Sequence, residues 1–205
     1  KAKNNIIRMG ENPDNVFMTG CPSLDLLHDM ELKLYKNIIN KYAGVGSEID
    51  ITKPYIMVVQ HPVTTEYDLS FKQIKITLNA IKRIADEGMQ VIFLWPNVDA
   101  GAGYIAKGLR QFRELNDLNG FKFYKNFTPE DYAILLNNCS CIVGNSSSGI
   151  REGGFLGVPC VNIGNRQKFR QRNINVVDVK LDSDEIYKKI EMVLTNGKHP
   201  TKNIY

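Results

Sequence analysis

Two short runs of apolar residues constrain the fold of this chain more than any other feature. The runs YIMVVQ (55–60) and MQVIFLWP (89–96) are rich in Ile, Val and aromatic side chains and contain no charged residue. Continuous apolar strands of this length are typical of parallel sheets, whose strands are buried on both faces. They predict two central strands, and similar runs predict further strands at 15–20, 121–124, 141–144, 159–164 and 174–179.

Amphipathic segments alternate with these strands. In residues 70–88, the side chains of Ile74, Leu78 and Ile81 recur at helical spacing, and Gly88 follows them as a stop signal. This segment therefore predicts a helix that packs one apolar face on the sheet. Comparable segments predict helices at 23–29, 30–43, 102–117, 128–139, 149–157 and 182–197.

The order of these elements predicts the fold class. Ser23 and Thr128 are expected to cap the helices that they begin, because a hydroxyl oxygen can accept a hydrogen bond from a first-turn N–H. Strands that alternate with helices and are buried on both faces form an α/β, doubly wound, mostly parallel sheet of the Rossmann-like kind. We expect residues 1–205 to form a single domain of this type.

Composition restricts the class of function. No apolar run approaches the roughly 18–20 residues that cross a bilayer, and the polar start KAKNNIIRMGENPD lacks a signal peptide, so we expect a cytoplasmic protein with no membrane partner. Because the chain begins at Lys1 and not at Met, we expect a fragment or a processed product. Cys139 and Cys141 lie one residue apart with no histidine nearby, which does not fit a zinc site. We therefore expect no metal, no cofactor and buried thiols.

The loops that follow the strands are the expected place for function, because ligands of such sheets bind at the carboxyl ends of the strands. Four of these loops have unusual compositions and should lie at one edge of the sheet. They read HPVTTEYD after 55–60, NVDAG after 89–96, GNSSSGIREGG after 141–144 and GNRQKFRQR after 159–164.

The loop GNSSSGIREGG predicts an anion site. Its serines lie at a helix start, where free N–H groups and the helix dipole favour a negative charge and the hydroxyls add donors. Glu152, further along, suits sugar hydroxyls better than a phosphate, and phosphate plus ribose indicates a nucleotide. The alternative is that Ser146 or Ser147 only caps the helix and Glu152 only supports its dipole.

The other three loops are less specific. His61 ends a strand and could donate to a phosphate, although a lone histidine there is more often structural. Asn97 and Asp99 could equally be turn residues. The cations of NRQKFRQR could bind nucleic acid as a patch, or Arg166 could bind a nucleotide at the strand end. The net charge of +4 is mild, so we expect no nucleic-acid partner.

These motifs together resemble the UDP-N-acetylglucosamine 2-epimerase family, in its hydrolysing, sialic-acid-pathway branch. The resemblance rests on RMGENPDNVFMTGCPSLD, QHPVTTEYD, PNVDAG, VGNSSSGIREGGFLGVPCVNIGNRQ and INVVDV, which occur in the family's order over almost the whole chain. Non-hydrolysing members typically carry Ser-Gly-Gly with two consecutive glutamates. Here Gly153 follows Glu152, which departs from that pattern.

The resemblance implies that this chain is the C-terminal, nucleotide-sugar-binding domain of a GT-B-type two-domain enzyme. The full-length enzyme would remove UDP from C1 and a proton from C2 of UDP-GlcNAc, and water would then add to give N-acetylmannosamine. The partner N-terminal domain, absent from this chain, would supply the proton-transfer carboxylates, so the fragment alone should be inactive. We also expect a homo-oligomer at full length. A GT-B glycosyltransferase and a non-hydrolysing 2-epimerase are the alternatives.

The resemblance also implies roles for individual residues. His61 would be catalytic, and with Asn97 it would face the phosphates or the sugar. Ser146 and Ser147 would bind the diphosphate and Glu152 the ribose. Two further residues would lie near the base, Arg166 on the uracil side and Phe127 through its backbone.

Overall fold

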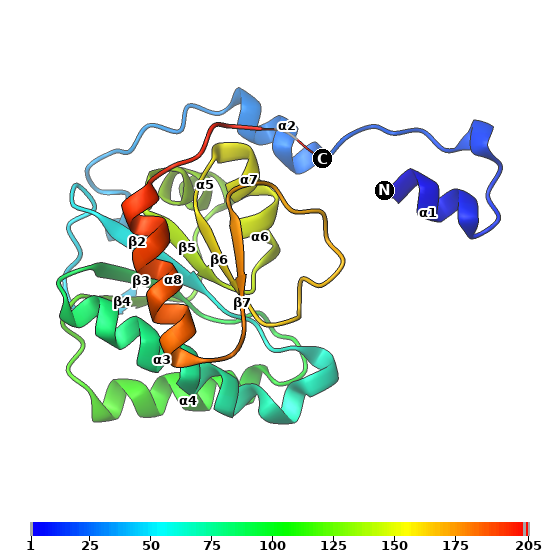
Figure 1. Ribbon diagram of the computed structural model, residues 1–205. Helices are drawn as coiled ribbons and strands as arrows, with labels where there is room; N and C mark the ends of the chain where they lie inside the picture. Colours follow the sequence, from blue (N-terminus) through cyan, green and yellow to red (C-terminus); the bar gives the residue numbers. More distant parts are fainter. Residues whose placement is uncertain (1, 203, 205) are drawn as a thin grey trace.

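The computed structural model describes residues 2–202 and residue 204, and within them it shows a seven-stranded, mostly parallel sheet (Figure 1). The strand order is β1-β4-β3-β2-β5-β6-β7. The six strands from β4 to β7 in this order are parallel, which confirms the predicted fold class. The strands are β1 (Gly44–Gly46), β2 (Tyr55–Val59), β3 (Gln90–Leu94), β4 (Phe121–Tyr124), β5 (Cys141–Gly144), β6 (Cys160–Ile163) and β7 (Val176–Val179).

Helices cover both faces of the sheet (Figure 1). One face carries α3 (Ser70–Asp86), α4 (Ala102–Leu115) and α8 (Ser183–Asn196). The opposite face carries α2 (Pro22–Asp29), α5 (Pro129–Asn138), α6 (Ser147–Ile150) and α7 (Glu152–Leu156). No helix in the described part of the chain combines the length and apolar character that a bilayer span requires.

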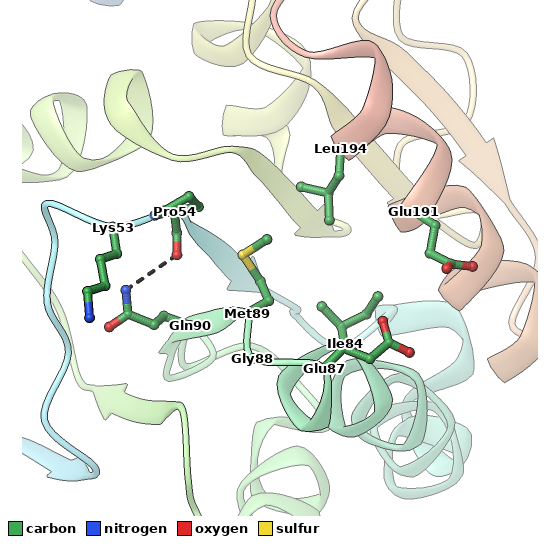
Figure 2. A pocket seen from close by; sticks show the side chains of 9 residues that line it. All are labelled: Lys53, Pro54, Ile84, Glu87, Gly88, Met89, Gln90, Glu191 and Leu194. Atoms are coloured by element: carbon green, nitrogen blue, oxygen red, sulfur yellow. Dashed lines mark hydrogen bonds between the residues drawn. The ribbon is translucent and has the colours of Figure 1, made fainter.

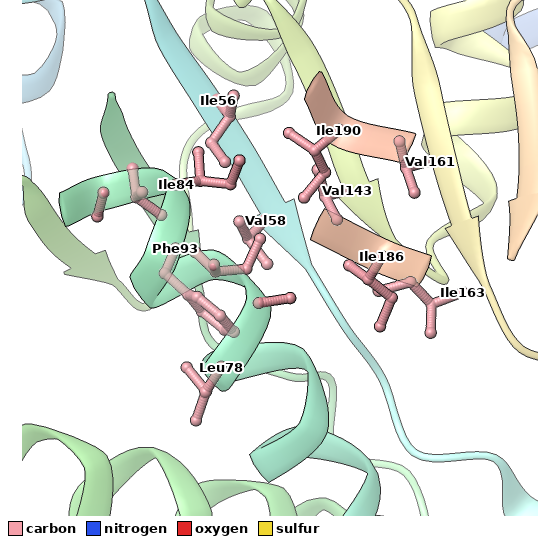
Figure 3. Close-up of a cluster of buried hydrophobic side chains, with 14 of the residues drawn as sticks. Ile56, Val58, Leu78, Ile84, Phe93, Val143, Val161, Ile163, Ile186 and Ile190 are labelled. Atoms are coloured by element: carbon pink, nitrogen blue, oxygen red, sulfur yellow. The ribbon is translucent and has the colours of Figure 1, made fainter. Parts of the chain in front are cut away.

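Strand β2 shows why its residues form a central strand. Ile56 and Val58 point into the core beneath α3 and α8, where Figure 3 shows them facing Ile190 and its neighbours. Met57 and Val59 point into the core on the other face. Burying one such side chain fully stabilises the fold by about 1.5–3 kcal/mol. An apolar run without alternation is therefore what a strand between two helical layers requires.

Local signals set several helix ends. Thr128 caps α5 as predicted, because its hydroxyl accepts a hydrogen bond from the N–H of Asp131 at 3.3 Å. The prediction for Ser23 is wrong, because α2 begins at Pro22 and its N-cap is Cys21. Proline suits the first helical position, where its missing N–H would have no partner in any case. The helix therefore begins one residue earlier than the serine signal indicates.

The predicted helix over residues 30–43 is wrong. Only Ile38–Lys41 form a short 3-10 helix (η2), and residues 31–35 have no regular structure. The hydroxyls of Tyr35 and Tyr42 both donate to the Asp131 carboxylate, each at 2.5 Å. These contacts with α5, together with the burial of Ile38, hold an irregular segment against the domain. Tertiary contacts thus outweigh the helical spacing of the apolar residues.

Two edges of the fold also differ from the prediction. Residues 16–20 form no strand, and Phe17 and Met18 are 78% and 84% exposed. This stretch belongs to an arm with α1 (Ala2–Arg8) and the 3-10 helix η1 (Pro13–Asn15), which extends away from the sheet (Figure 1). Conversely, β1 is a strand that the apolar runs do not predict, and it pairs antiparallel with β4. Local sequence predicts neither outcome, because a short segment forms an edge strand only where another strand lies beside it.

Candidate functional site

The candidate site lies at the carboxyl ends of β2 and β5, where the chain order of the sheet reverses. From β2 the chain continues through α3 to β3 on one side, whereas from β5 it continues through α6 and α7 to β6 on the other side. Ligands of doubly wound sheets bind in the crevice at such a switch point. Because β2, β3, β5 and β6 are parallel, all four unusual loops do lie at this edge, as predicted.

Gly144 brings these two strand ends together. Its φ angle is +130°, and a Cβ atom at this position would lie 2.1 Å from the Val59 carbonyl oxygen. Only glycine can therefore end β5 this close to β2. The residue after it, Asn145, then donates its N–H to the same Val59 oxygen at 3.1 Å.

Asn145 connects three of the four loops. Its amide oxygen accepts from the N–H of His61 at 2.7 Å, and its amide nitrogen donates to the His61 carbonyl at 2.8 Å. Its own carbonyl accepts from Arg166 Nη1 at 3.2 Å and from Gln167 Nε2 at 2.8 Å. The side chain is only 2% exposed, so these groups have no water to replace a lost partner. No local sequence signal indicates this role of Asn145, because its partners are 84 and about 20 residues away.

The His61 imidazole is neutral near pH 7. Burial first, and then the Arg166 cation, lower the pKa of His61 to about 4, against the opposing effect of Asp99. Its Nδ1 accepts from the backbone N–H of Asn97 at 3.1 Å, so the single proton belongs on Nε2. His61 Nε2 is thus a hydrogen-bond donor that carries no charge. Asn97 serves it through the backbone, and the Asn97 side chain is exposed.

The three serines at the start of α6 make different contacts. Ser146 is the N-cap, and its hydroxyl accepts from the N–H of Ser148 at 3.3 Å. Ser146 therefore caps the helix, as the structural alternative predicts. The predicted helix over 149–157 is corrected to two short ones, α6 from Ser147 and α7 from Glu152, because Arg151 between them has a ψ angle of −71°.

Ser148 faces a cavity of about 300 Å³ on one side of α6. Its hydroxyl lies 2.5 Å from the Tyr132 hydroxyl and 2.9 Å from that of Ser146. Most of the walls are apolar and come from α2 and α5. This Glu152 cavity is lined by Ser23, Leu26, Leu27, Met30, Pro129, Glu130, Tyr132, Ala133, Leu136, Ser148 and Glu152.

Glu152 is the unusual member of this cavity. Its Oε1 pairs with Arg151 Nη2 at 2.9 Å. Its Oε2 is buried and accepts no hydrogen bond from any described residue. A buried carboxylate oxygen without a donor is costly, because it has lost its water and gained no partner. The geometry therefore offers a strong acceptor to any hydroxyl or N–H that a ligand brings.

Ser147 lines a second hollow beside α6, a groove of about 600 Å³. Arg166 lies in this groove, where its Nη2 approaches Asp99 Oδ2 at 3.5 Å. The groove is polar and carries several cations. This Arg166 groove is lined by Val63, Thr64, Thr65, Asp99, Ser147, Asn165, Arg166, Gln167, Lys168, Phe169 and Arg170. Thr64 and Thr65 begin the 3-10 helix η3 (Thr64–Leu69) that follows His61.

Three of the predicted site residues line the groove or the cavity, whereas His61, Asn97 and Ser146 line neither. Ser147 and Arg166 share the groove, whereas Glu152 lies in the cavity with Ser148. Phe127 is 3% exposed, and its ring packs in the core against Tyr42 and Tyr124. It lines neither of the two, so its side chain is part of the core.

The opposite edge of the sheet offers a contrast (Figure 2). A cleft of about 360 Å³ there is lined by residues such as Pro54, Gln90 and Leu194, and Gln90 Nε2 donates to the Pro54 carbonyl at 3.3 Å. No predicted site residue lines it. Elsewhere in the described ranges, no three His, Cys, Asp or Glu side chains are placed to hold a metal ion. Cys139, Cys141 and Cys160 are buried free thiols, as expected.

A family model described as UDP-N-acetylglucosamine 2-epimerase matches residues 1–205. This chain belongs to the UDP-N-acetylglucosamine 2-epimerase family. Two family members are similar in sequence. The UDP-N,N'-diacetylbacillosamine 2-epimerase (hydrolyzing) of Legionella pneumophila is 30% identical over 205 residues, which cover 100% of this chain and 51% of that protein. The GDP/UDP-N,N'-diacetylbacillosamine 2-epimerase (hydrolyzing) of Campylobacter jejuni is 29% identical over 190 residues, which cover 92% and 47%.

A solved member of the epimerase family has the same fold. The UDP-GlcNAc 2-epimerase of Methanocaldococcus jannaschii, in complex with UDP-GlcNAc and UDP, matches with a TM-score of 0.66 at 18% identity. The match covers 98% of this chain and 54% of that one. The chain therefore spans about half the length of the relatives that it matches, and it fits the C-terminal domain of a GT-B-type member of the family.

Proposed function

We propose that this chain is the UDP-binding half of a hydrolysing 2-epimerase. The full-length enzyme would convert UDP-GlcNAc, or a related 2-acetamido UDP-sugar, to UDP and the free sugar epimerised at C2. The observation that carries the proposal is that a cavity with an unpartnered carboxylate oxygen and a cationic groove meet at the start of α6. The hydrolysing relatives support water as the acceptor.

The nucleoside would occupy the Glu152 cavity. Ribose hydroxyls are donors, and Glu152 Oε2 is the buried acceptor that lacks one. The apolar walls from Leu26, Leu27 and Leu136 suit the faces of a uracil ring. Phe127 would bind the base through its backbone, since its side chain is held in the core.

The diphosphate would lie at the start of α6. Ser147 would donate its hydroxyl there, and Ser146 would take part with whichever proton its contact with Ser148 leaves available. Arg166 shares the groove with Ser147, and this neighbourhood favours a phosphate over the uracil as its partner. The neutral His61 would donate from Nε2, and Asn97 would hold that imidazole in place through its backbone N–H.

These donors would act on the leaving group. In the elimination step, a base removes the C2 proton, the C1–O bond breaks, and its electron pair leaves on the β-phosphate oxygen of UDP. Fixed donors and a cation that face this oxygen stabilise the charge that it gains. Water then adds across the resulting glycal double bond, with a proton to C2 and hydroxyl to C1. We propose that the carboxylates for the proton transfers belong to the partner N-terminal domain.

Product analysis of the full-length protein tests this function. Incubation with UDP-GlcNAc, and separately with UDP-N,N'-diacetylbacillosamine, should release UDP and the C2-epimeric free sugar from one of them. With UDP-GlcNAc the product would be N-acetylmannosamine, which would place the enzyme in the sialic-acid branch. A product that keeps its UDP would indicate a non-hydrolysing epimerase. Sugar transfer to an added acceptor would indicate a glycosyltransferase. Sedimentation of the same sample would test the proposed homo-oligomer.

A further inference from the structure

We infer that Phe169 is a specificity-determining residue that contacts the sugar part of a UDP-sugar in the Arg166 groove. The inference rests on the proposed function and extends it from the nucleotide to the sugar. Its starting point is a backbone conformation that the side chain disfavours.

Phe169 has a φ angle of +71°, and it is the one non-glycine with positive φ among the residues that the structure describes. Bulky side chains rarely adopt this conformation, because the Cβ atom crowds the backbone. A glycine would adopt it without strain, as ten glycines of this chain do. Strain of this kind persists where the surrounding structure enforces it, and it often marks a functional position.

Hydrogen bonds on both sides of Phe169 enforce this turn. The N–H of Lys168 donates to the Asn165 carbonyl at 2.8 Å, and the N–H of Arg170 donates to the Gln167 carbonyl at 3.2 Å. The ring is 77% exposed and lies near the Lys168 ammonium group, whose nitrogen is 5.1 Å from the ring centroid. Packing in the core therefore does not explain the phenylalanine. The chain holds a large apolar ring at the surface in a conformation that suits glycine.

The position of the ring indicates what it would meet. Phe169 lines the same groove as Ser147 and Arg166 and does not line the Glu152 cavity. A diphosphate at the start of α6 carries the nucleoside on one side and the sugar on the other. With the ribose at Glu152, the sugar extends into the Arg166 groove.

The chemistry of the groove also fits. Apart from Val63 and Phe169, its lining is polar or charged, and among the described residues that line it Phe169 is the one with an aromatic ring. A 2-acetamido sugar offers an acetamido methyl group and a face of C–H groups. An aromatic ring binds such groups by burial and by contact with its π face. Hydroxyls of the same sugar can bind to Thr64 and Thr65.

Phe169→Gly in the full-length protein tests the inference, because glycine removes the ring and the strain together. The expected result is an unchanged Kd for UDP, a KM for the UDP-sugar raised about three- to tenfold, and a melting temperature equal to or above wild type. Phe169→Ala should raise KM equally but melt lower than Phe169→Gly, since alanine keeps the strain. Phe169→Tyr, which keeps an aromatic ring, should have the KM of the wild type. Tyr104→Ala, which removes an exposed ring from α4, is the matched control and should leave KM unchanged.

Two results would overturn the inference while leaving the proposed function intact. One is a Phe169→Gly variant with wild-type KM, and the other is an equal loss of affinity for UDP and UDP-sugar. If the wild-type protein binds UDP-sugar no better than buffer controls, the proposed function itself fails.

Discussion

The Glu152 cavity and the Arg166 groove are both lined by residues of one short helix, α6, and they differ in physical character. The cavity has mostly apolar walls and one carboxylate oxygen without a partner, whereas the groove is wider, polar and cationic. Consecutive residues, Ser148 and Ser147, face the two sides. The difference indicates that the two regions suit different parts of one ligand. The cavity suits a group that can be buried and can donate to one acceptor, whereas the groove suits a charged group.

This comparison makes uridine and UDP a useful pair of probes. Uridine carries only the groups that suit the Glu152 cavity, whereas UDP adds the phosphates that suit the groove. A substitution in the cavity should lower the affinity for both ligands equally. A substitution in the groove should lower the affinity for UDP and leave the affinity for uridine unchanged.

Asn145→Ala should have the largest effect. It leaves the His61 N–H and carbonyl buried without the Asn145 side chain, and each such group costs about 1–3 kcal/mol, so the free energy of unfolding should fall by about 2–6 kcal/mol. UDP affinity should fall more than uridine affinity, because the substitution removes both side-chain contacts to the His61 loop, whereas the backbone carbonyl that binds Arg166 remains. Denaturant unfolding and calorimetry on the full-length protein would measure the two effects.

Asn173→Ala is the matched control for Asn145→Ala. Asn173 is 7% exposed, and its amide donates to the carbonyls of Gly154 and Lys202, outside the His61 loop. It should lower stability to a similar degree and spare UDP binding. If both variants bind UDP equally well, Asn145 serves only the fold.

Glu152→Gln should have the next largest effect and should define the cavity side. Loss of charge-assisted bonds to the ribose should weaken UDP and uridine alike, by about 1.5–3 kcal/mol. Glu130→Gln, which changes an exposed carboxylate on the same cavity wall, should leave both affinities unchanged. Calorimetry with both ligands gives the measurement, and a loss for UDP alone would place the phosphates, not the ribose, at Glu152.

Acid should destabilise the protein through His61. The pKa of His61 is about 4 in the fold and about 6.5 when unfolded, so between these values the unfolded chain binds more protons. This contribution to stability is present above pH 6.5 and is lost as the pH falls toward 4, by about 2 kcal/mol between pH 7 and pH 5. His61→Gln should flatten this part of the unfolding profile. His28→Gln, at an exposed site, should not, and a profile unchanged by His61→Gln would contradict a neutral buried imidazole.

Ser147→Ala should have the smallest effect and separates binding from capping. It should weaken UDP binding by about 0.5–1.5 kcal/mol. Uridine affinity and the ligand-free melting temperature should not change. Ser146→Ala should instead lower ligand-free stability by about 1 kcal/mol, since Ser146 is the N-cap of α6. Equal losses of UDP and uridine affinity in Ser147→Ala would contradict a phosphate contact.

The fold class and the edge of the sheet that carries the site follow from local sequence. Apolar runs such as 55–60 are strands because only a sheet covered on both faces buries every one of their side chains, and the unusual loops must then gather at the carboxyl ends of those strands. Thr128 and Pro129 set the start of α5 through contacts within one helical turn. Each of these features depends on neighbours in the chain, and local sequence therefore suffices to predict it.

The division of the site and the contacts that hold it depend on segments that are distant in the chain. Asn145 binds His61 across 84 positions of the chain, and Tyr35 and Tyr42 bind Asp131 across about 90, which keeps their segment from becoming a helix. Ser147 and Ser148 are identical neighbours in sequence, yet in α6 Ser147 lines the groove and Ser148 lines the cavity. These outcomes depend on groups that meet only after the sheet has formed, and a buried polar group then takes whichever partner the packing places within hydrogen-bonding distance.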